Sequence, residues 1–297
     1  KSGTLTIDPA SLIVAAQDSR STYGTMPVVN GYTASGLVNG DSVNSVDLTT
    51  GATAKSNVGN YEISASGAKG AGLSNYNVTY KTGTLTIDPA SLTIAAQDSH
   101  SVYGSVPVTN GYTVEGLVNN DSVNSVDLMT NATAKSGVGA YEIDASNAAG
   151  SGLSNYTVSY KSGTLTIDPA ALTVSAQDNH SVYGSVPVTN GYTVDGLVNN
   201  DSVNSVDLST AATAKSGVGS YEIAAKNASG SGLSNYTVIY KSGTLTIDPA
   251  ALTVTAQDQH GQAGSYTFDK SAYKTTGLLN NDSVSSVDLT TAATEKS

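Results

Sequence analysis

The chain has 297 residues, of which only 12% are charged, and its 13 Lys and Arg against 24 Asp and Glu give a net charge of −11. Such an acidic chain repels phosphate groups, so nucleic acid and anionic membrane surfaces are poor partners. The absence of Cys excludes disulfides, zinc–thiolate sites and thiol nucleophiles, and no apolar run approaches the roughly 18 residues that cross a bilayer, so we expect no membrane insertion.

One sequence segment recurs along the chain every 80 residues. Lys-Ser-Gly-Thr-Leu-Thr-Ile-Asp-Pro-Ala begins at Lys1 and returns at Lys81 (with one change), Lys161 and Lys241. The second and third copies differ at only 13 of 80 positions. Solenoid repeats are shorter, about 20 to 50 residues, whereas about 80 residues suffice for a small domain. The sequence therefore predicts a string of small modules that all perform the same function.

The Asp-Pro-Ala segment, as at Asp88–Ala90, marks the boundaries between modules. It separates two strand-like runs, and Pro cannot donate a hydrogen bond within a sheet. We expect each module to close its own core, with a stiff three-residue joint to the next. The predicted division is residues 1–8 as the last strand of a preceding module, 9–88, 89–168 and 169–248 as three complete modules, and 249–297 as an incomplete, divergent fourth.

Within a module the apolar pattern has a period of two, which predicts strands. Asn110-Gly111 lies inside one expected strand and favours a tight turn or a bulge. The inward parity changes before Leu165, so we expect a bend or bulge at Gly163. In the second module the expected strands are 92–96, 108–114, 141–143, 156–160 and 165–167.

One segment, Asn120–Asp127, departs from this alternation. Asp121 can cap a helix, and Val123 and Val126 are spaced to lie on one helical face. We therefore expect one or two helical turns there. The predicted fold class is mostly β: small α+β modules, β-grasp-like or Ig-like, with one short helix, strung in tandem as beads in a rod.

An ordered set of motifs resembles a known family. Tyr103-Gly104 is followed by Gly-Leu-Val-Asn-Asn-Asp at 116–121, Asn-Tyr-Thr-Val at 155–158 and Gly-Thr-Leu-Thr-Ile at 163–167. This order is similar to the MBG repeat of very large secreted bacterial adhesins, many of them resembling filamentous haemagglutinins. The resemblance implies a small, mostly-β module at the cell surface or in a biofilm matrix, without family catalytic residues.

The fourth module departs from this pattern. Its Tyr-Gly is replaced by Ala263-Gly264, it lacks the counterpart of Pro107, and one residue is inserted, so Tyr192 matches Tyr273. We expect a divergent edge in this module.

Carboxylates are the best candidates for a metal site, because Ca²⁺ takes six to eight oxygen ligands. The candidates are Asp121, Asn124 and Asp127, which recur in every complete module, and Asp88 with Asp98 at a joint. The spacing of three is not that of an EF-hand loop. Helix capping, solvation and an Asp-Pro turn are the simpler interpretations, so we assign no catalytic, cofactor or metal residue.

The remaining candidates favour structural roles. His100 has no second His in its module, and we interpret it as a surface residue. The alternating Tyr residues are expected in the core, with each hydroxyl paired or reaching water. A Lys–Asn cross-link of Lys135 with Asn155 would need a buried acid, and Glu142 is expected to be exposed instead.

These patterns predict a structural spacer or stalk of a giant extracellular bacterial adhesin or matrix fibre, which projects a binding tip and supports adhesion or biofilm formation. Its partners would be neighbouring modules of the chain, and also further copies of itself or extracellular polysaccharide. Two alternatives are a multivalent carbohydrate- or matrix-polymer-binding module that acts by avidity, and a self-associating fibre subunit. No nucleophile–base pair or metal cluster recurs, so we expect no enzyme.

Overall fold

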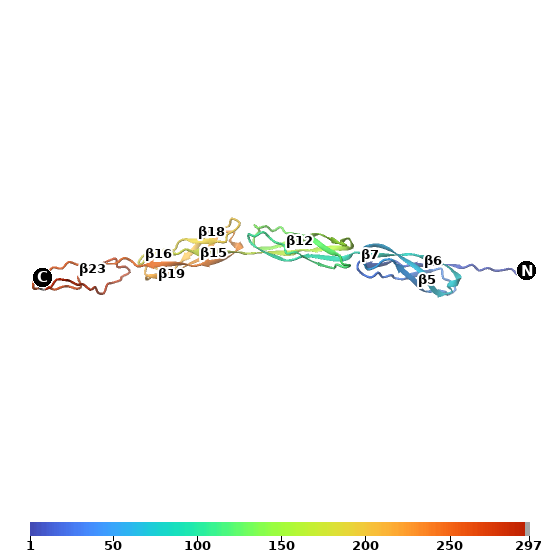
Figure 1. Cartoon of the computed structure of the whole chain (residues 1–297), viewed down its shortest axis with the longest axis horizontal. Coiled ribbons are helices and arrows are strands. Elements are labelled where there is room, and N and C mark those ends of the chain that lie inside the picture. Colours follow the sequence, from blue (N-terminus) through green and yellow to red (C-terminus); the bar gives the residue numbers. More distant parts are fainter. Residues whose placement is uncertain (295–297) are drawn as a thin grey trace. The chain divides into compact units, whose positions relative to one another are not determined.

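A computed structural model describes residues 1–294, and each of the three complete repeats in this part contains the same seven strands (Figure 1). The strands of the first repeat are β1 (Ala10–Ala16), β2 (Ser19–Thr22), β3 (Tyr32–Ser35), β4 (Ser42–Thr50), β5 (Gly59–Ala71), β6 (Tyr76–Lys81) and β7 (Gly83–Asp88). Those of the second repeat are β8 (Ala90–Ala96), β9 (Ser99–Val102), β10 (Tyr112–Glu115), β11 (Ser122–Met129), β12 (Gly139–Ser151), β13 (Tyr156–Lys161) and β14 (Gly163–Asp168).

The third repeat follows the same order, and the fourth segment has two strands among its described residues. The strands of the third repeat are β15 (Ala170–Ala176), β16 (Asn179–Val182), β17 (Tyr192–Asp195), β18 (Ser202–Ser209), β19 (Gly219–Ser231), β20 (Tyr236–Lys241) and β21 (Gly243–Asp248). Those of the fourth are β22 (Thr253–Ala256) and β23 (Tyr273–Thr276), which pair antiparallel.

Each complete repeat folds into two mixed sheets. In the first repeat their strand orders are β3-β1-β6 and β2-β7-β5-β4, and the third repeat has the corresponding orders. Strand β1 pairs antiparallel with β3 and parallel with β6, while β7 pairs parallel with β2 and antiparallel with β5. The mostly-β prediction is confirmed. The choice between a β-grasp-like and an Ig-like module stays a prediction.

The set of alternate residues that faces inward changes before the last strand of each repeat, and the structure shows why. Strand β13 ends at Lys161 and β14 begins at Gly163, so Ser162 lies outside both strands. Gly163 packs against backbone: a Cβ placed there would lie 2.8 Å from the carbonyl oxygen of Ala96. After this interruption Leu165 is fully buried. The predicted bend at Gly163 therefore agrees with the fold.

The predicted helix at Asn120–Asp127 is wrong, because Ser122–Met129 forms strand β11. The spacing of three between Val123 and Val126 comes from irregular pairing with β12, whose register shifts between Val123 and Ser125 and again between Ser125 and Asp127. Such bulges insert an extra residue and bring both valines to the inner side of the strand. A bulged strand thus imitates helical spacing.

Short 3₁₀ turns occur elsewhere, at positions that the strand pattern does not reveal. They span Leu73–Asn75, Leu153–Asn155 and Leu233–Asn235 and directly precede β6, β13 and β20. Each follows a glycine in the left-handed region, such as Gly152 with φ of 72°. The turn places its last residue, Asn155, at only 4% exposure.

The hydrophobic interior passes from the first repeat into the second. One cluster of buried side chains contains Ile63 and Leu85 from the first repeat together with Leu92, Ile94 and Tyr156 from the second. A separate cluster in the other half of the first repeat contains Leu12, Val14 and Tyr76. The expectation that every repeat closes its own interior is therefore wrong at this boundary.

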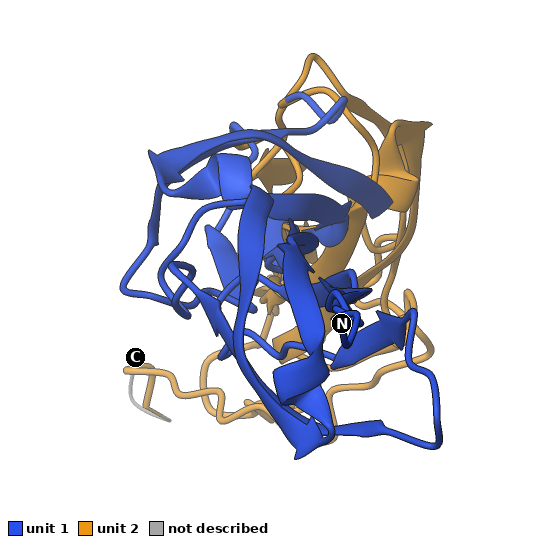
Figure 2. Cartoon of the chain, turned by 90° about the vertical axis from the view of Figure 1, so that its right-hand side faces the viewer, with its two compact units in different colours: residues 1–101, 106–133, 139–167 blue, residues 102–105, 134–138, 168–297 orange. Residues whose placement is uncertain are grey.

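The compact units of the chain also differ from the 80-residue division (Figure 2). Unit 1 comprises residues 1–101, 106–133 and 139–167, and unit 2 comprises residues 102–105, 134–138 and 168–297. Two loops of the second repeat thus belong to the unit that contains the third. Among residues 1–294 no helix is long and apolar enough to cross a bilayer.

Residues 1–9 form no strand, and Leu5 and Ile7 are exposed by 86% and 85%. We expected residues 1–8 to be the last strand of a module. The matching strand β7 pairs with β2 and β5, which both precede it in the chain. The assignment of residues 1–8 to a preceding module stays a prediction.

Candidate functional site: the joint between repeats

Only one residue separates the strands of the first repeat from those of the second. Strand β7 ends at Asp88 and β8 begins at Ala90, so Pro89 alone lies between them, and not the three residues expected. The carboxylate of Asp88 accepts two hydrogen bonds from the Arg20 guanidinium, at 2.9 and 3.0 Å. The hydrogen bond from Arg20 lowers the pKa of Asp88. The carbonyl of Asp88 also accepts from the amide of Tyr23 at 2.9 Å.

Tyr23 reaches from the first repeat into the second. Its hydroxyl donates to Oδ2 of Asp121 at 2.9 Å, and the hydroxyl of Tyr156 donates to the same atom at 2.8 Å. The amide of Val118 donates to the Tyr156 hydroxyl at 2.9 Å. Both tyrosines are buried, with exposures of 5% and 8%. One carboxylate oxygen therefore joins tyrosines from two repeats.

The two tyrosine rings also pack directly on each other. The centroids of Tyr23 and Tyr156 are 5.5 Å apart and the ring planes meet at 81°, an edge-to-face pair. Burial raises the pKa of Tyr156, and the nearby Asp121 carboxylate raises it further. The protonated hydroxyl is the form that donates to the carboxylate, so both influences preserve this contact at neutral pH.

Two amide side chains hold the loops beside this pair. Oδ1 of the buried Asn155 accepts from the amide of Val58 at 2.9 Å, and its Nδ2 donates to Oδ1 of Asn57 at 3.1 Å. Nδ2 of Asn119 donates to the carbonyl of Ala54 at 3.0 Å. These contacts span about one repeat length in sequence. They satisfy the buried side chain of Asn155 and partly buried groups beside it, which would otherwise destabilise the joint.

Gly24 allows the two repeats to approach each other. It has φ of 84°, in the left-handed region that favours glycine. A Cβ added to it would lie 2.5 Å from Cγ2 of Val118, closer than atoms can pack. We call the side formed by Tyr23, Gly24 and the 53–58 loop the Tyr-Gly end. The receiving side, called the Asp face, is formed by Val118, Asn119, Asp121, Asn155 and Tyr156.

The second joint reproduces these contacts within unit 2. The hydroxyls of Tyr103 and Tyr236 each donate to Oδ2 of Asp201 at 2.9 Å, and their ring centroids are 5.5 Å apart. The amide of Val138 donates to Oδ1 of Asn235 at 2.9 Å. The joint thus recurs with the same atoms and nearly the same distances.

The fourth segment receives the third repeat in the same way. The hydroxyl of Tyr183 donates to Oδ2 of Asp282 at 2.9 Å, and Nδ2 of Asn280 donates to the carbonyl of Ala214 at 2.8 Å. Gly184 lies against Leu279, which occupies the position of Val118. The fourth segment therefore keeps three residues of an Asp face, Leu279, Asn280 and Asp282.

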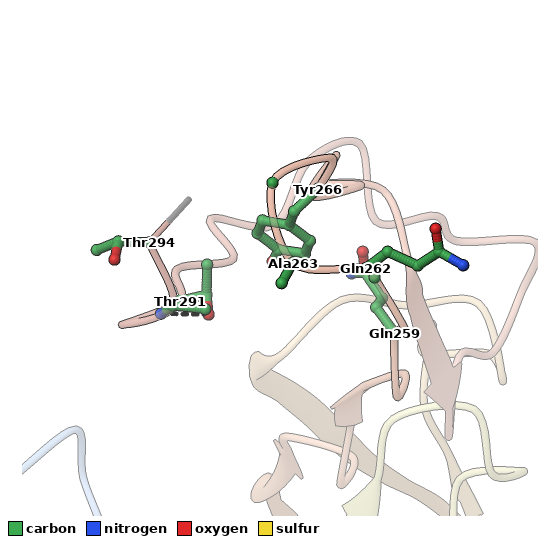
Figure 3. Close-up of a pocket in the computed structure, with 9 residues that line it drawn as sticks. Gln259, Gln262, Ala263, Tyr266, Thr291 and Thr294 are labelled. Carbon is green, nitrogen blue, oxygen red and sulfur yellow. Dashed lines mark hydrogen bonds between the residues drawn. The ribbon is translucent and has the colours of Figure 1, made fainter. Parts of the chain in front are cut away.

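The Tyr-Gly end of the fourth segment is different. Ala263 stands where the other repeats have the tyrosine, and it lines a pocket of about 260 Å³ with Gln259, Gln262, Tyr266 and Thr291 (Figure 3). In this view the ring of Tyr266 lies beside Ala263. No tyrosine hydroxyl is available at this position to meet a following carboxylate. The fourth segment can receive a repeat through this joint but cannot offer the same donor.

The structure does not bring the predicted calcium ligands together. Asp121 serves the joint, Asp127 accepts from Nδ2 of Asn147 at 2.9 Å, and Asn124 is exposed. Asp98 accepts from the amide of Thr164 at 2.7 Å. Among residues 1–294 no three Asp, Glu or His side chains are grouped so that they could hold a metal ion. Calcium binding at these positions stays a prediction without structural support.

In the third repeat a histidine occupies the position of Arg20 and lies beside the aspartate at the end of the repeat. In the third repeat Nδ1 of His180 lies 3.1 Å from Oδ2 of Asp248, with both side chains partly exposed. This pair corresponds to Arg20 and Asp88 in the first repeat. It is an ion pair only when the histidine is protonated. Glu142 is exposed, as expected.

A family model matches each of the three complete repeats. The model of the MBG domain, YGX type, matches residues 12–86, 92–166 and 172–246, which together make up most of the chain. The chain belongs to the MBG domain family. Each joint has a Tyr-Gly pair on one side, as at Tyr23 and Gly24. This pair corresponds to the Y and G of the family description.

Other comparisons add little to the MBG assignment. No curated protein matches the chain. A solved structure, SGBP-B of the Bacteroides ovatus mixed-linkage glucan utilization locus in complex with a mixed-linkage heptasaccharide, is 11% identical and has a TM-score of 0.14. That match covers 82% of this chain and 70% of the other. At this TM-score it supports no statement about the fold or ligand of these MBG repeats.

The repeat pattern of the sequence contains the residues of the joint but does not show that they meet. The alternating pattern predicts Tyr103 and Tyr156 as core tyrosines and Asp121 as a helix cap. A usable signal was present: the fourth segment loses its tyrosine at Ala263 yet keeps the aspartate at Asp282. Separate loss of one motif suggests that the two motifs serve different boundaries.

Proposed function

We propose that this chain is a spacer segment of an extracellular bacterial adhesin or matrix fibre, in which each MBG repeat holds the next in a fixed orientation. The observation that supports the proposal is the recurring joint, in which a tyrosine hydroxyl from one repeat meets an aspartate of the next. A spacer needs a connection that repeats identically, because its reach then grows with every copy added.

The joint has three properties of a stiff connection. Pro89 is the only residue between the strands of the first two repeats, and proline has a fixed φ. Hydrogen bonds from Tyr23 and to Asn155 restrain both sides of the boundary. The hydrophobic cluster continues across it. A Gly/Ser linker would instead leave neighbouring domains free to reorient.

The carbohydrate-binding alternative requires a recurring groove lined by Tyr and Asn. In the first repeat Asn39, Asn75 and Tyr76 do line a pocket of about 370 Å³. In the second repeat the corresponding residues include Asn155 and Tyr156, which contact the preceding repeat. The Asp face is therefore used for the joint where repeats follow one another, which favours the spacer. The proposal assigns no reaction to the chain.

Double electron–electron resonance between adjacent repeats tests the proposal. Because the chain has no Cys, the substitutions Glu62→Cys and Glu142→Cys would place two spin labels at exposed, equivalent positions of the first and second repeats. We expect one narrow distance distribution, which should broaden when Gly24→Val is added to disrupt the joint. A pair of labels at Glu142 and Ser91, within one repeat, is the control. A broad distribution in the unmodified joint would contradict the spacer proposal.

A further inference from the structure

We propose that each complete repeat is a tension-bearing element, in which one long parallel ladder between its first and last segments resists stretching along the chain. The spacer proposal concerns the orientation of neighbouring repeats at the joint. This inference goes beyond it, because it assigns a mechanical role to the interior of the repeat and rests on the pairing of strands within single repeats.

The first and last segments of the first repeat pair in parallel along nearly their whole length. Residues 10–15 of β1 pair with residues 76–81 of β6, and residues 19–22 of β2 pair with residues 85–88 of β7. Partners are 66 residues apart in both stretches, so no residue is gained or lost between them. We call this pairing of residues 10–22 with 76–88 the terminal ladder. At about 3.3 Å per residue it extends about 40 Å along the strand.

The terminal ladder passes from one sheet to the other without an interruption in contact. Strands β1 and β6 belong to one sheet, and β2 and β7 belong to the other. At the crossing, Oδ1 of Asp18 accepts from the amide of Thr84 at 2.7 Å. A Cβ on Gly83 would lie 2.8 Å from the carbonyl oxygen of Ala16, so the two backbones stay close there. The same side-chain contact recurs at 2.7 Å in the other complete repeats, from Thr164 to Asp98 and from Thr244 to Asp178.

The chain enters and leaves the terminal ladder at opposite ends. Ala10, where the chain enters, pairs with Tyr76, whereas Asp88, where it leaves, pairs with Thr22. Because the paired strands are parallel, tension pulls one segment back through Ala10 and the other forward through Asp88. The two segments must then slide along each other, which strains the evenly spaced bonds of the ladder together. A load that separated the segments from one end would break the same bonds one pair at a time.

Apolar side chains on the terminal ladder are buried in both sheets. Leu12 and Val14 in β1 are fully buried in a cluster with Tyr76, and Leu85 in β7 is fully buried in a cluster with Ile63. Hydrogen bonds are stronger in such a low-dielectric interior than in water. Sliding of the segments would therefore have to disrupt this packing as well as the ladder.

The third repeat has the same terminal ladder. Residues 170–175 pair in parallel with residues 236–241, and residues 179–182 pair with residues 245–248, again 66 residues apart. Between the first and second repeats, β7 continues through Pro89 alone into β8, and the φ of proline is fixed. Tension therefore passes from one terminal ladder towards the next with little chain available to extend between them.

Single-molecule force spectroscopy in two pulling directions tests the inference on the full chain. Because the chain has no Cys, Ser11→Cys and Ser91→Cys place attachment points at exposed positions that load the terminal ladder of the first repeat by sliding. Ser11→Cys and Asn77→Cys instead place them on two paired residues at one end of the ladder, so the same repeat is unzipped. Circular dichroism and urea unfolding check that both double variants are folded and equally stable.

We expect the sliding load to unfold the repeat at a force at least about twofold higher than the unzipping load, because the whole ladder shares it. Unfolding should release up to about 280 Å of chain in the first direction and about 230 Å in the second, at about 3.5 Å per residue, which identifies the events. The matching pairs in the third repeat should give the same order of forces: Ala171→Cys with Ala251→Cys, and Ala171→Cys with Thr237→Cys.

The crossing between the sheets provides a more local test. Asp18→Ala removes the acceptor of the Thr84 amide and should raise the unfolding rate under the sliding load about threefold or more. It should leave the unzipping force unchanged, because the pairs that open first lie at the far end of the ladder, at Ser11 and Asn77. Asp18→Asn keeps an acceptor oxygen and should restore the slower rate.

Equal unfolding forces in the two directions, or a higher force on unzipping, would overturn the inference. An equal effect of Asp18→Ala in both directions would overturn the role of the crossing. The electron resonance measurement at the joint is independent of these outcomes. A narrow distance between the first two repeats together with equal unfolding forces would leave the spacer proposal standing and remove only the mechanical role of the terminal ladder.

Discussion

The hydroxyl of Tyr23 lies 2.9 Å from Oδ2 of Asp121, although 98 residues separate the two along the chain. The same donor and acceptor meet at the two following boundaries, through Asp201 and Asp282. The tyrosine and the aspartate are thus brought together across a boundary, the tyrosine from one repeat and the aspartate from the next. This relationship gives the Tyr-Gly motif a structural role at the boundary between repeats.

Removing one docking hydroxyl should weaken the joint. Tyr103→Phe leaves Asp201 with only the Tyr236 hydroxyl, and hydrogen bonds to charged groups contribute about 1.5–3 kcal/mol. We expect a loss in that range in the free energy of unfolding, measured with urea. Tyr160→Phe is the matched control, because its exposed hydroxyl accepts from Ala148 inside the same repeat. Equal losses in the two variants would contradict a special role for the joint.

The loss of stability caused by a Gly→Ala substitution should depend on the space around that glycine at its boundary. Gly104→Ala would bring Cβ to 2.6 Å from Cγ2 of Val198, whereas at Gly184 the neighbour is the flexible end of Leu279, and at Gly264 nothing lies within 4 Å. All three have φ near 85°, so backbone strain of about 1–2 kcal/mol is common to them.

We therefore expect Gly104→Ala to lower the melting temperature most, Gly184→Ala less and Gly264→Ala least. Differential scanning calorimetry of the three variants measures this order. Because the strain is shared, the difference between Gly104→Ala and Gly264→Ala isolates the contact across the joint. Equal shifts for all three variants would mean that the close approach at Gly104 is unimportant.

The buried side chain of Asn155 in the second repeat should contribute more to stability than the exposed Asn75 at the same position of the first repeat. Asn155→Ala removes the acceptor of the Val58 amide, and an unsatisfied buried donor costs about 1–3 kcal/mol. We expect faster hydrogen exchange at Val58 and lower stability. Asn75→Ala changes the same repeat position where the side chain is exposed, and should have little effect. A similar effect of both substitutions would argue against burial by the neighbouring repeat.

The joint should weaken at high pH. Burial raises the pKa of Tyr156 and Tyr236 above the ordinary value of 10.0. The folded state therefore holds these protons more tightly than the unfolded chain does. Their contribution to stability is complete below about pH 10 and is lost as the pH rises through the raised pKa. Urea unfolding between about pH 8 and 11 should show this loss.

The control is the double variant Tyr156→Phe and Tyr236→Phe, which lacks the titrating hydroxyls. Its stability should be lower at pH 8 but should decline less between pH 8 and pH 11, about one unit on the alkaline side of the ordinary tyrosine value. If the two proteins lose stability in parallel, other groups cause the alkaline effect.

The carboxyl of Asp88 should titrate below its ordinary value of 3.8, because Arg20 hydrogen-bonds its charged form. A lowered folded pKa means that the contribution is present above about pH 4 and is lost as the pH falls through the folded value. Carboxyl chemical shifts measured by NMR should show the low pKa, and Arg20→Gln should return it towards the ordinary value. An unchanged titration in that variant would contradict the pairing.

Much of the fold could be predicted from the sequence because strands and bends are indicated by residues that are close together in the chain. Alternation at Leu92 and Ile94 indicates a strand, and Gly163 marks the bend before the last one. The helix was mispredicted because the bulges around Ser125 restore a spacing of three that is normally helical. The joint could not be derived from one repeat: Tyr103 and Asp121 lie in the same copy, yet each contacts a different neighbour.

Because the tyrosine and the aspartate of one copy, such as Tyr103 and Asp121, contact different neighbouring copies, insertion or deletion of a whole copy leaves every remaining boundary with a complementary pair. Unequal recombination between nearly identical coding segments could therefore change the number of repeats without creating a mismatched contact. The gene could adjust the span of its product in steps of one copy. Only changes that divide a copy, or that replace its tyrosine as at Ala263, would interrupt the series.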